Sequence, residues 1–448
     1  MSAPAPARPP SPGLARLRAD ARDIFGAGLR AVEPRAAVRA HLRLDGDAVM
    51  VGSTRFPLSP TGRVRVVAVG KAAAPMAQEA EAILGPRLCE GIAVTKRGHG
   101  VALERVLLRE SGHPIPDAAG LAATAEVERL LADGRPQDLV LCLVSGGASA
   151  LLPSPAPGLG LAEEQAVAAL LLACGADIAE SNAVRKHLSR LKGGGLVRAA
   201  RPAGAAGLIL SDVVGDPLDV VGSGPTVADP TTVADARAII ARYGLRLPPH
   251  IEAFLAMPEA ETPKPGDARL AGVETRMVAA PALSIAAAGQ VATAAGYRVI
   301  DLGDRVEGEA REVGREHAHI ALKTRGPAAI LSGGETTVTL TGTGRGGRNS
   351  EYALALAIAL EGTARISAIA CDTDGIDGSQ DNAGAMVLPD TLARARRLGL
   401  DPGAFLANND AFGFFAALGD LVVTGPTLTN VNDFRAVVVE PDSGQRQA

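Results

Sequence analysis

Arginine residues alternate with glycines in residues 341–350, TGTGRGGRNS, a pattern suited to binding an anion. Arg345 and Arg348 supply two guanidinium groups, and Asn349 or Ser350 can cap the Ala- and Leu-rich helix predicted to follow. A helix N-terminus and nearby guanidinium groups both favour negative charge. The run therefore predicts a cradle for an oxyanion or a phosphate group.

Lys71 stands at a second position of this kind, in the sequence VVAVGKAAAPM. The apolar run before it predicts a strand and the Ala-rich run after it predicts a helix, so Lys71 lies where a helix start favours an anion. The glycine spacing excludes a Walker A loop. The alternative is an ordinary solvated lysine on the surface.

Aspartates follow two further strand-like runs and could bind a metal ion or a hydroxyl group. After ISAIA come Asp372, Asp374, Asp377 and Asp381, in a spacing that does not fit a calcium loop but is compatible with Mg²⁺ beside a phosphate. After GLILS come Asp212, Asp216 and Asp219, followed by the glycine-rich turn GSGP. For both groups, simple turn-forming aspartates are the alternative.

A basic segment and two Ser-Gly-Gly runs complete the candidates. Residues 181–195, SNAVRKHLSRLKGGG, predict a helix whose cations either form a solvated face or meet an anion near the glycines. The runs at residues 145–147 and 332–334 are each expected to end a buried strand. His317 and His319 are two residues apart, which points them to different sides of a helix, so surface positions are expected rather than a metal site.

The elements that position these residues predict an α/β protein. Continuous Val, Ile and Leu runs alternating with Ala-rich helices indicate, in the N-terminal half, a mainly parallel, Rossmann-like sheet covered by helices on both faces. In the C-terminal half the strand candidates lie too close together for intervening helices, which predicts a mixed sheet. With 448 residues, the chain should form at least two domains.

Pro-rich segments suggest the domain boundaries, and the net charge argues against some classes of binding partner. We expect a disordered Pro-rich tail at residues 1–13, an N-terminal domain at 14–256, a Pro-rich linker at 257–267 and a C-terminal domain at 268–448. The net charge of −4 offers no general attraction for nucleic acid or anionic membranes. Four scattered cysteines without CxxC spacing, and the lack of a signal-peptide pattern, favour a cytoplasmic protein with reduced thiols.

Taken together, the motifs resemble the class II glycerate kinases, whose C-terminal half is the MOFRL domain. The resemblance rests on VAVGKAA, LVSGGASALL, SNAVRKHLSRLKGG, LSDVVGDPLDVVGSGPT, LSGGETTVT, GRGGRNSEYALA and DTDGIDG, in this order along the chain. It implies ATP-dependent phosphorylation of D-glycerate at the 2-hydroxyl, giving 2-phosphoglycerate, with Mg²⁺, in a cleft between two α/β domains. The implied partners are small molecules, with a homodimer as the expected assembly.

These motifs assign the expected site residues by position in this sequence. The expected catalytic residues are Lys71, Asp212 and Arg348, and the expected Mg²⁺ ligands are Asp374 and Asp377. Residues expected to bind substrate or nucleotide are Ser145, Gly146, Gly147, Ser149, Asn182, Arg185, Lys186, Lys192, Gly333, Gly334, Glu335, Gly346, Gly347 and Asn349.

Two other functions compete with the kinase interpretation. A hydroxypyruvate reductase would need a nicotinamide site, yet no GxGxxG fingerprint stands between the first strand and its helix. A non-catalytic protein that binds sugar acids would have little use for an aspartate cluster next to an Arg- and Gly-rich loop. The phosphotransferase remains the favoured prediction.

Overall fold

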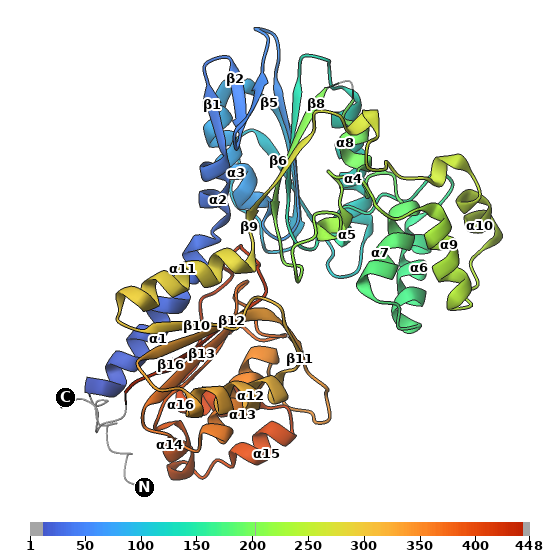
Figure 1. Cartoon of the computed structure of the whole chain (residues 1–448). Coiled ribbons are helices and arrows are strands. Elements are labelled where there is room, and N and C mark those ends of the chain that lie inside the picture. The colour runs from blue at the N-terminus through green and yellow to red at the C-terminus, as the bar shows by residue number, and fades with distance from the viewer. Residues whose placement is uncertain (1–11, 202, 442–448) are drawn as a thin grey trace. The chain divides into compact units, whose positions relative to one another are not determined.

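The structure, a computed structural model, describes residues 12–201 and 203–441, which form two compact units (Figure 1). One unit contains residues 33–280 and 428–430, and we call it the parallel-sheet unit. The other contains residues 12–32, 281–427 and 431–441, and we call it the mixed-sheet unit.

The parallel-sheet unit is built on six parallel strands in the order β6-β5-β4-β7-β8-β9. Every residue of β7 is buried, because helices cover both faces of the sheet, and this explains the uninterrupted apolar run LVLCLV. The strands are β4 (Val64–Val69), β5 (Leu88–Lys96), β6 (Val106–Ser111), β7 (Leu139–Val144), β8 (Gly204–Leu210) and β9 (Glu274–Ala279).

The connecting helices lie on opposite faces of this sheet because the chain crosses it in both directions. Helix α3 (Ala73–Leu84) joins β4 to β5, whereas α4 (Ala118–Ala132) leads from β6 back to β7. On the α4 face, Val127 and Leu131 pack with Leu196 of α8 (Gly195–Ala199) against Val140 and other strand residues. The predicted parallel, doubly covered sheet is confirmed.

Two smaller groups of elements extend the parallel-sheet unit. Strands β1 (Leu42–Asp45), β2 (Ala48–Val51) and β3 (Thr54–Pro57) form an antiparallel sheet next to α2 (Pro34–His41). Helices α6 (Leu161–Ala173), α7 (Ile178–His187), α9 (Val233–Arg242) and α10 (Pro249–Leu255) share a separate apolar core. The latter group carries the basic helix of the sequence analysis.

The mixed-sheet unit contains the strand order β10-β12-β16-β13-β14-β15, and β11 also pairs with β12. Along β16, Ala436 and Val438 face one apolar core while Val437 and Val439 face the other, the two-residue alternation of a strand buried on both sides. The strands are β10 (Arg298–Asp301), β11 (Val306–Glu309), β12 (Ala328–Thr337), β13 (Ile366–Asp372), β14 (Gly384–Val387), β15 (Leu421–Val422) and β16 (Asp433–Val439).

Helices cover both faces of the mixed sheet as well. One face carries α1 (Pro12–Ala31) and α11 (Pro281–Ala294), and the other carries α12 (Ala310–Lys323), α13 (Arg348–Leu360), α14 (Thr391–Arg397), α15 (Pro402–Ala407) and α16 (Ala411–Leu418). Helix α1 thus packs on strands β13 and β16, which lie more than three hundred residues later. Leu17, Ile24 and Phe25 supply its buried side, and Phe25 contacts the ring of Phe434.

The compact units therefore differ from the domains expected from sequence. The chain passes between them near residues 32 and 280 and again around 428–430, not at the Pro-rich segment 257–267, which belongs to the parallel-sheet unit. The reason is that β9 follows this segment and completes the parallel sheet beside β8. Of the expected tail at residues 1–13, residues 1–11 lie outside the described residues, and α1 begins at Pro12.

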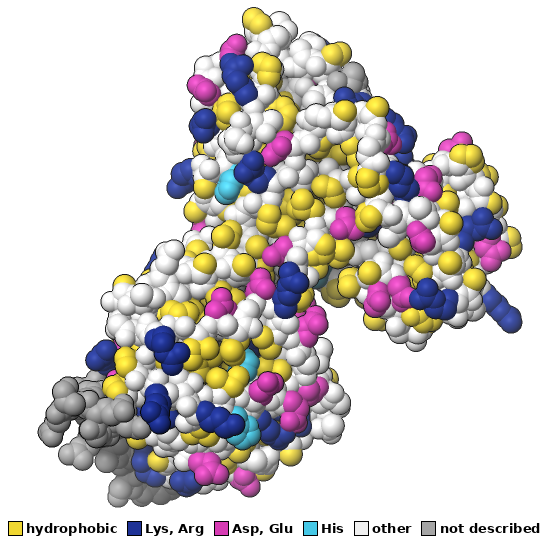
Figure 2. Space-filling view, viewed as in Figure 1, with side chains coloured by type: hydrophobic (Ala, Val, Ile, Leu, Met, Phe, Trp, Pro, Cys, Tyr) yellow, Lys and Arg dark blue, Asp and Glu magenta, His cyan; other side chains and the backbone are white. Residues whose placement is uncertain are grey.

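Surface charge agrees with the balanced composition. On the face shown in Figure 2, Lys and Arg side chains are interspersed with Asp and Glu, and no large patch of one sign stands out among the coloured residues. None of the described helices combines the length and apolar character needed to cross a membrane.

His317 is buried, contrary to the surface position expected for it. It lies on α12, is 4% exposed, and its Nδ1 is 2.8 Å from the hydroxyl of the fully buried Tyr352. Its neighbour in the sequence pattern, His319, is exposed as expected. Burial, and next the positive charge of Arg435, lower the pKa of His317 to about 4. The imidazole is therefore neutral in the folded protein near neutral pH.

We expect His317 to make stability depend on pH. Its folded pKa of about 4 lies below the ordinary value of 6.5, so the unfolded chain binds the extra proton first and stability falls as pH drops through this window. From pH 7 to pH 5 the loss should be about 2 kcal/mol in the free energy of unfolding.

Urea denaturation of the wild type, His317→Gln and His319→Gln at both pH values measures this contribution. His317→Gln should lose less stability on acidification than the wild type, and the exposed-site variant His319→Gln should match the wild type. Equal acid sensitivity in all three proteins would contradict the assignment.

Candidate functional site

Two strand-to-helix turns lie side by side at the carboxyl edge of the parallel sheet. The N–H of Lys71, after β4, donates to the carbonyl oxygen of Gly146, after β7, at 2.9 Å. The N–H of Ala72 donates to Ser145 Oγ at 3.0 Å. A Cβ at Gly70 would lie 2.2 Å from Ser145 Oγ, so this close approach requires glycine. The fold thereby brings Lys71 and the first Ser-Gly-Gly turn together.

Asp212 lies against the backbone of the same turn. A Cβ at Gly146 would be 1.7 Å from Asp212 Oδ2, which is why a side chain cannot be accommodated there. Gly147 has a φ of +83°, and a Cβ on it would lie 3.5 Å from Lys71 Cγ and 2.9 Å from His113 Cδ2. A cation, a carboxylate and an imidazole therefore surround two adjacent glycines.

His113 and Asn430 are neighbours of this site that the sequence analysis does not single out. Asn430 Nδ2 donates to Asp212 Oδ2 at 3.1 Å, although Asn430 comes from the short segment 428–430 far along the chain. His113 follows β6, whose carboxyl end lies at the same sheet edge as those of β4 and β7. The position of His113 soon after a strand could have identified it from the sequence. The residues around Asn430 carry no such pattern.

Asn182 and Ser149 belong to one polar network next to these turns. Ser223 Oγ donates to Asn182 Oδ1 at 3.0 Å and contacts Ser149 Oγ. Ser223 has a φ of +62°, an uncommon conformation for a non-glycine residue that often marks a functional site. The N–H of Gly193 also donates to the carbonyl oxygen of Ser223, at 2.9 Å. The basic segment, the glycine triplet and the loop after β8 are thus joined.

Lys186 is fully engaged within the protein. It is 1% exposed, and its Nζ lies 3.3 Å from Asp219 Oδ2 and 3.2 Å from Asp229 Oδ1. Two carboxylates already balance its charge. Lys186 was predicted to bind substrate or nucleotide. Its buried position on α7 and its two ion pairs favour a structural role instead.

Arg185 and Lys192 differ from Lys186 in having fewer carboxylates around them. Lys192 Nζ donates to Glu164 Oε1 at 2.7 Å. Arg185 makes no hydrogen bond or ion pair with any of the described residues, and its Nε is buried without a partner. Burial lowers the pKa of Arg185, and the negative charge of Glu164 opposes this effect. Arg185 is therefore the cation of this helix best suited to receive an anion.

The second Ser-Gly-Gly run does not end a strand, so that prediction is wrong. Strand β12 continues through it from Ala328 to Thr337. Gly334 has a φ of +116°, and a Cβ there would lie 2.2 Å from the carbonyl oxygen of Val306 in β11. The glycine allows β11 to approach β12, which gives Gly334 a packing reason in place of the predicted turn, whereas Gly333 has no atom of β11 among its nearest neighbours.

Arg348 is the centre of an ionic cluster at the start of α13. Its Nε donates to Asp433 Oδ1 at 2.7 Å, its Nη2 to Asp372 Oδ2 at 2.9 Å and its Nη1 to Glu335 Oε1 at 2.7 Å. Burial alone would lower the pKa of Arg348, but the charges of Asp433, Asp372 and Glu335 outweigh it and raise the pKa. Three of the five N–H groups are used, so two remain for an anion.

Asp433 connects Arg348 to the buried part of the unit. It is 2% exposed, accepts a hydrogen bond from Asn349 Nδ2 at 2.7 Å and pairs with the buried Arg435. Asn349, predicted to contact substrate or nucleotide, thus uses its amide nitrogen inside the protein, while its Oδ1 is buried without a hydrogen-bond partner. The cluster holds Arg348 in place through residues on three strands, β12, β13 and β16.

Asp377 caps helix α13, which differs from its predicted role as a metal ligand. Its Oδ1 accepts from the N–H of Asn349 at 2.9 Å and its Oδ2 from the N–H of Ser350 at 2.8 Å. A Cβ at Gly347 would lie 2.3 Å from Asp377 Oδ1, so the glycine makes room for this carboxylate. Gly347 is the N-cap residue, and the side-chain cap comes from Asp377 rather than from Asn349 or Ser350.

Asp374 lies beside Asp372. The N–H of Asp374 donates to Asp372 Oδ1 at 3.1 Å. Burial, and next the negative charge of Asp374, raise the pKa of Asp372 well above its ordinary range. Within the described part of the chain, no group of three or more His, Cys, Asp or Glu side chains is arranged to hold a metal ion. A Mg²⁺ ion at Asp372 and Asp374 would need oxygen ligands from a phosphate or water.

The capping role of Asp377 leads to a stability prediction. Asp377→Ala should lower the free energy of unfolding by about 2 kcal/mol, because it removes two hydrogen bonds to buried helix N–H groups. The matched control is Asp401→Ala, which removes the cap of α15 at an exposed position and should cost less. Chemical denaturation measures both variants. A cost no larger for Asp377→Ala than for Asp401→Ala would argue against the capping role.

Two family models match this chain. A domain of unknown function, DUF4147, matches residues 20–256, and the MOFRL family matches residues 328–433. The chain is 37% identical to the glycerate 2-kinase of Pyrococcus horikoshii, covering 94% of this chain and 97% of that protein. It is 49% identical to a protein of Agrobacterium vitis named as a hydroxypyruvate reductase, covering 93% of each.

Solved structures give the same relationship. The crystal structure of a glycerate kinase from Thermotoga maritima matches with a TM-score of 0.85 and 36% identity, over 95% of this chain and all of that one. Similarity of sequence and of fold thus extends over nearly the whole chain. The chain belongs to the glycerate kinase family whose members carry the MOFRL domain.

Proposed function

We propose that this chain transfers the γ-phosphoryl group of ATP to the 2-hydroxyl of D-glycerate and forms 2-phosphoglycerate, with Mg²⁺ as the metal. The observation that carries the proposal is the convergence of Lys71 and Asp212 on the backbone of Gly146 and Gly147. Phosphoryl transfer depends mainly on positioning the reactants and stabilising negative charge.

Lys71 is suited to stabilise the charge on the phosphoryl group. Its backbone is bonded to the Ser-Gly-Gly turn, so its Cα has a defined position at the sheet edge. As an ammonium group on a flexible stem, it acts as a point charge towards phosphate oxygens. Arg185, which has no ion pair among the described residues, is a further cation of the parallel-sheet unit suited to an anionic ligand.

Asp212 is suited to accept the proton of the attacking hydroxyl. Kinases of other folds use an aspartate in this way. Here the carboxylate packs on Gly146, and Asn430 donates to its Oδ2. These contacts fix the carboxylate in one orientation, which is the requirement for a general base that must meet one substrate proton.

The residues at Asp372 and Asp374 fit a divalent cation. Asp372 and Asp374 are neighbouring acidic residues, and the Asp372 carboxylate also accepts a hydrogen bond from Arg348 Nη2 at 2.9 Å. Mg²⁺ typically uses one or two carboxylates together with phosphate oxygens and water. Bound there, it would neutralise charge on the transferred phosphate. Asp377 has no part in this proposal because both of its oxygens cap α13.

Arg348 is suited to bind the carboxylate of glycerate. Its carboxylate partners orient the guanidinium group, and two N–H groups remain for a planar anion. We therefore assign it to substrate positioning rather than to proton transfer.

One coupled assay tests the reaction. The purified chain is incubated with ATP, Mg²⁺ and D-glycerate, and enolase is added as the only coupling enzyme. Enolase consumes 2-phosphoglycerate directly, so immediate formation of phosphoenolpyruvate is expected. If product forms only after phosphoglycerate mutase is also added, the transfer occurs at the 3-hydroxyl and the positional part of the proposal fails.

The metal assignment predicts a specific kinetic change. Asp374→Asn should raise the Mg²⁺ concentration that gives half-maximal rate, because one anionic ligand is lost. Asp381→Asn is the control, since Asp381 is an exposed aspartate of the same loop. Titrating Mg²⁺ at saturating ATP and glycerate measures both. An unchanged Mg²⁺ dependence for Asp374→Asn would remove Asp374 from the metal site.

Hydroxypyruvate reduction is the second candidate, because the relative from Agrobacterium vitis carries that name. The turn after β4 argues against it: it contains Gly70 followed by Lys71, without the glycine fingerprint of a dinucleotide site. Oxidation of NADH in the presence of hydroxypyruvate measures this activity. Turnover at a rate comparable to that of the kinase assay would overturn the preference for the kinase.

A further inference from the structure

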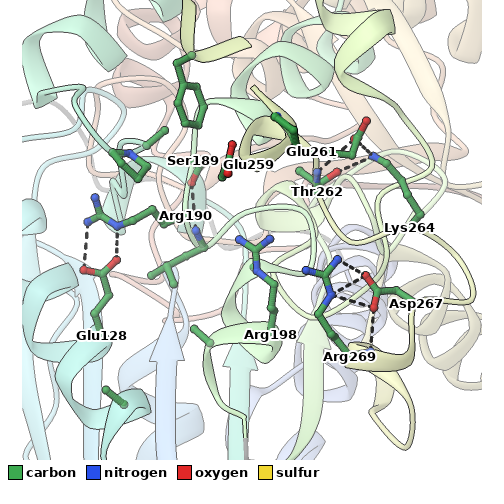
Figure 3. Close-up of a pocket in the computed structure, with 18 residues that line it drawn as sticks. Glu128, Ser189, Arg190, Arg198, Glu259, Glu261, Thr262, Lys264, Asp267 and Arg269 are labelled. Atoms are coloured by element: carbon green, nitrogen blue, oxygen red, sulfur yellow. Dashed lines mark hydrogen bonds and ion pairs between the residues drawn. The ribbon is translucent and has the colours of Figure 1, made fainter. Parts of the chain in front are cut away.

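A pocket of the parallel-sheet unit contains a cation that has no ion-pair partner among the described residues. The pocket has a volume of about 640 Å³ and lies between the end of α4, helix α8 and the segment 254–269 (Figure 3). Ser189, Arg190, Leu191 and Gly195 of the basic segment line it, but none of the residues predicted to be catalytic, metal-binding or ligand-binding does. Its volume lies within the range of pockets that bind small organic molecules.

Most charged side chains of this pocket are already paired, as the dashed lines of Figure 3 show. Arg190 is held by the carboxylate of Glu128 through Nε at 2.6 Å and Nη2 at 3.1 Å. Arg269 is held in the same way by Asp267, and Lys264 pairs with Glu261. These pairs need no further anion.

Arg198 is the exception among the cations. It is partly buried on α8 and makes no hydrogen bond or ion pair with any residue that the structure describes. In Figure 3 its guanidinium group lies next to that of Arg269. Burial, and next the positive charge of Arg269, lower the pKa of Arg198, with Asp267 opposing. An incompletely hydrated cation without a partner is costly unless an anion joins it.

The rest of the wall suits an organic ligand rather than a bare ion. Leu191 and Phe254 are buried with part of their surface on the pocket, and Ala156 and Ala199 also line it. An apolar wall with one oriented charged group is the usual composition of a small-molecule site. Glu259 lines the same pocket, is exposed, and likewise has no ion pair among the described residues.

We propose that this pocket binds a small organic anion, with its carboxylate or phosphate group on Arg198 and its apolar part against Phe254 and Leu191. The site is separate from the proposed active site and does not depend on the proposed reaction. The shared chemistry is an anionic group with two or more oxygens that can accept from a guanidinium fork.

Calorimetric titration with small probes tests the site. Phenyl phosphate and benzoate, titrated separately, distinguish a phosphate from a carboxylate ligand, and phenol is the uncharged control. The wild type should bind at least one of the two anions and should bind phenol much more weakly. Failure of both anions to bind would overturn the proposal.

Three variants locate the binding. Arg198→Gln should weaken anion binding about 10-fold or more, the loss expected for charge-assisted hydrogen bonds. Arg246→Gln, at an exposed arginine outside the pocket, should leave it unchanged. Glu259→Gln should strengthen binding, because it removes a negative charge that repels the probe. Equal affinity of Arg198→Gln and the wild type would overturn the proposal.

Two further readouts separate this site from the active site and from a folding defect. Excess ATP or D-glycerate should not displace the bound probe, and displacement would place the probe at the active site instead. Without ligand, Arg198→Gln should melt no lower than the wild type, because the side chain makes no ion pair that its replacement could lose. Should that variant prove unstable, Glu259→Gln still provides the test, and weaker binding of the anions would overturn the proposal.

Discussion

Lys71→Ala should lower kcat for glycerate phosphorylation about 100-fold or more while the protein stays folded, comparable to the loss of one strong charge-stabilising contact. Such a fall corresponds to about 2.7 kcal/mol in the activation free energy. The reason is positional. The N–H of Lys71 is bonded to Gly146, and the Lys71 side chain lies near Gly147, which follows the glycine that the Asp212 carboxylate covers. The backbone bond does not depend on the side chain, so the melting temperature should change little.

The matched control for Lys71 is Lys96→Ala. Lys96 ends strand β5, the neighbour of β4, at the same edge of the sheet, and both lysines are partly buried. If the reaction only needed positive charge somewhere along this edge, the two variants would lose similar activity. We expect a large fall in kcat for Lys71→Ala and a small one for Lys96→Ala. A near-wild-type kcat for Lys71→Ala would refute its role.

The sequence predicted the parallel sheet because burial on both faces leaves a direct trace. Strand β7, LVLCLV, is apolar at every position and is buried at every position. The same reasoning could not place α1. Its periodic pattern of Leu17, Ile24 and Phe25 shows that one side is buried, but an amphipathic pattern does not say which sheet it packs on. Its partner strands lie at the other end of the chain.

Glycine pairs were ambiguous for a related reason. A glycine can serve a tight turn or a close approach of two backbones, and sequence alone does not separate these uses. At Gly146 the approaching group is the carboxylate of Asp212, while at Gly334 it is the backbone of Val306 in β11. The identical letters Ser-Gly-Gly therefore have different structural causes in the two units.

Contacts with residues distant in the sequence decide which charged candidates are already paired inside the protein and which are not. Arg185 and Lys186 are adjacent on α7, yet only Lys186 meets two carboxylates, from Asp219 and Asp229. Likewise Asp377 was predicted to hold metal with Asp374, but the start of α13 takes both of its oxygens. Residue type and spacing predicted where charge gathers. Which charges are already balanced depends on tertiary contacts that spacing does not report.

Arg348→Lys should raise the KM for D-glycerate about 10-fold or more and leave the KM for ATP nearly unchanged. Lysine keeps the charge but loses the planar fork that binds a carboxylate through two N–H groups. It also cannot reproduce the bonds to Asp433, Asp372 and Glu335 at once, so the free energy of unfolding should fall by about 1–3 kcal/mol. Steady-state kinetics with each substrate varied in turn, together with urea denaturation, measure both effects.

Arg311→Lys separates the kinetic effect from the structural one. Arg311 is similarly half-buried and pairs with Glu351 and Glu309, so its replacement also disturbs an arginine–carboxylate cluster of the mixed-sheet unit. It should lose stability without a change in either KM. If Arg348→Lys behaves in the same way, Arg348 only holds the carboxylates together. If only the KM for ATP rises, Arg348 acts on the phosphates. A selective rise in the KM for glycerate assigns the guanidinium group to the substrate carboxylate, because the loss of stability is common to both variants and only the substrate contact differs.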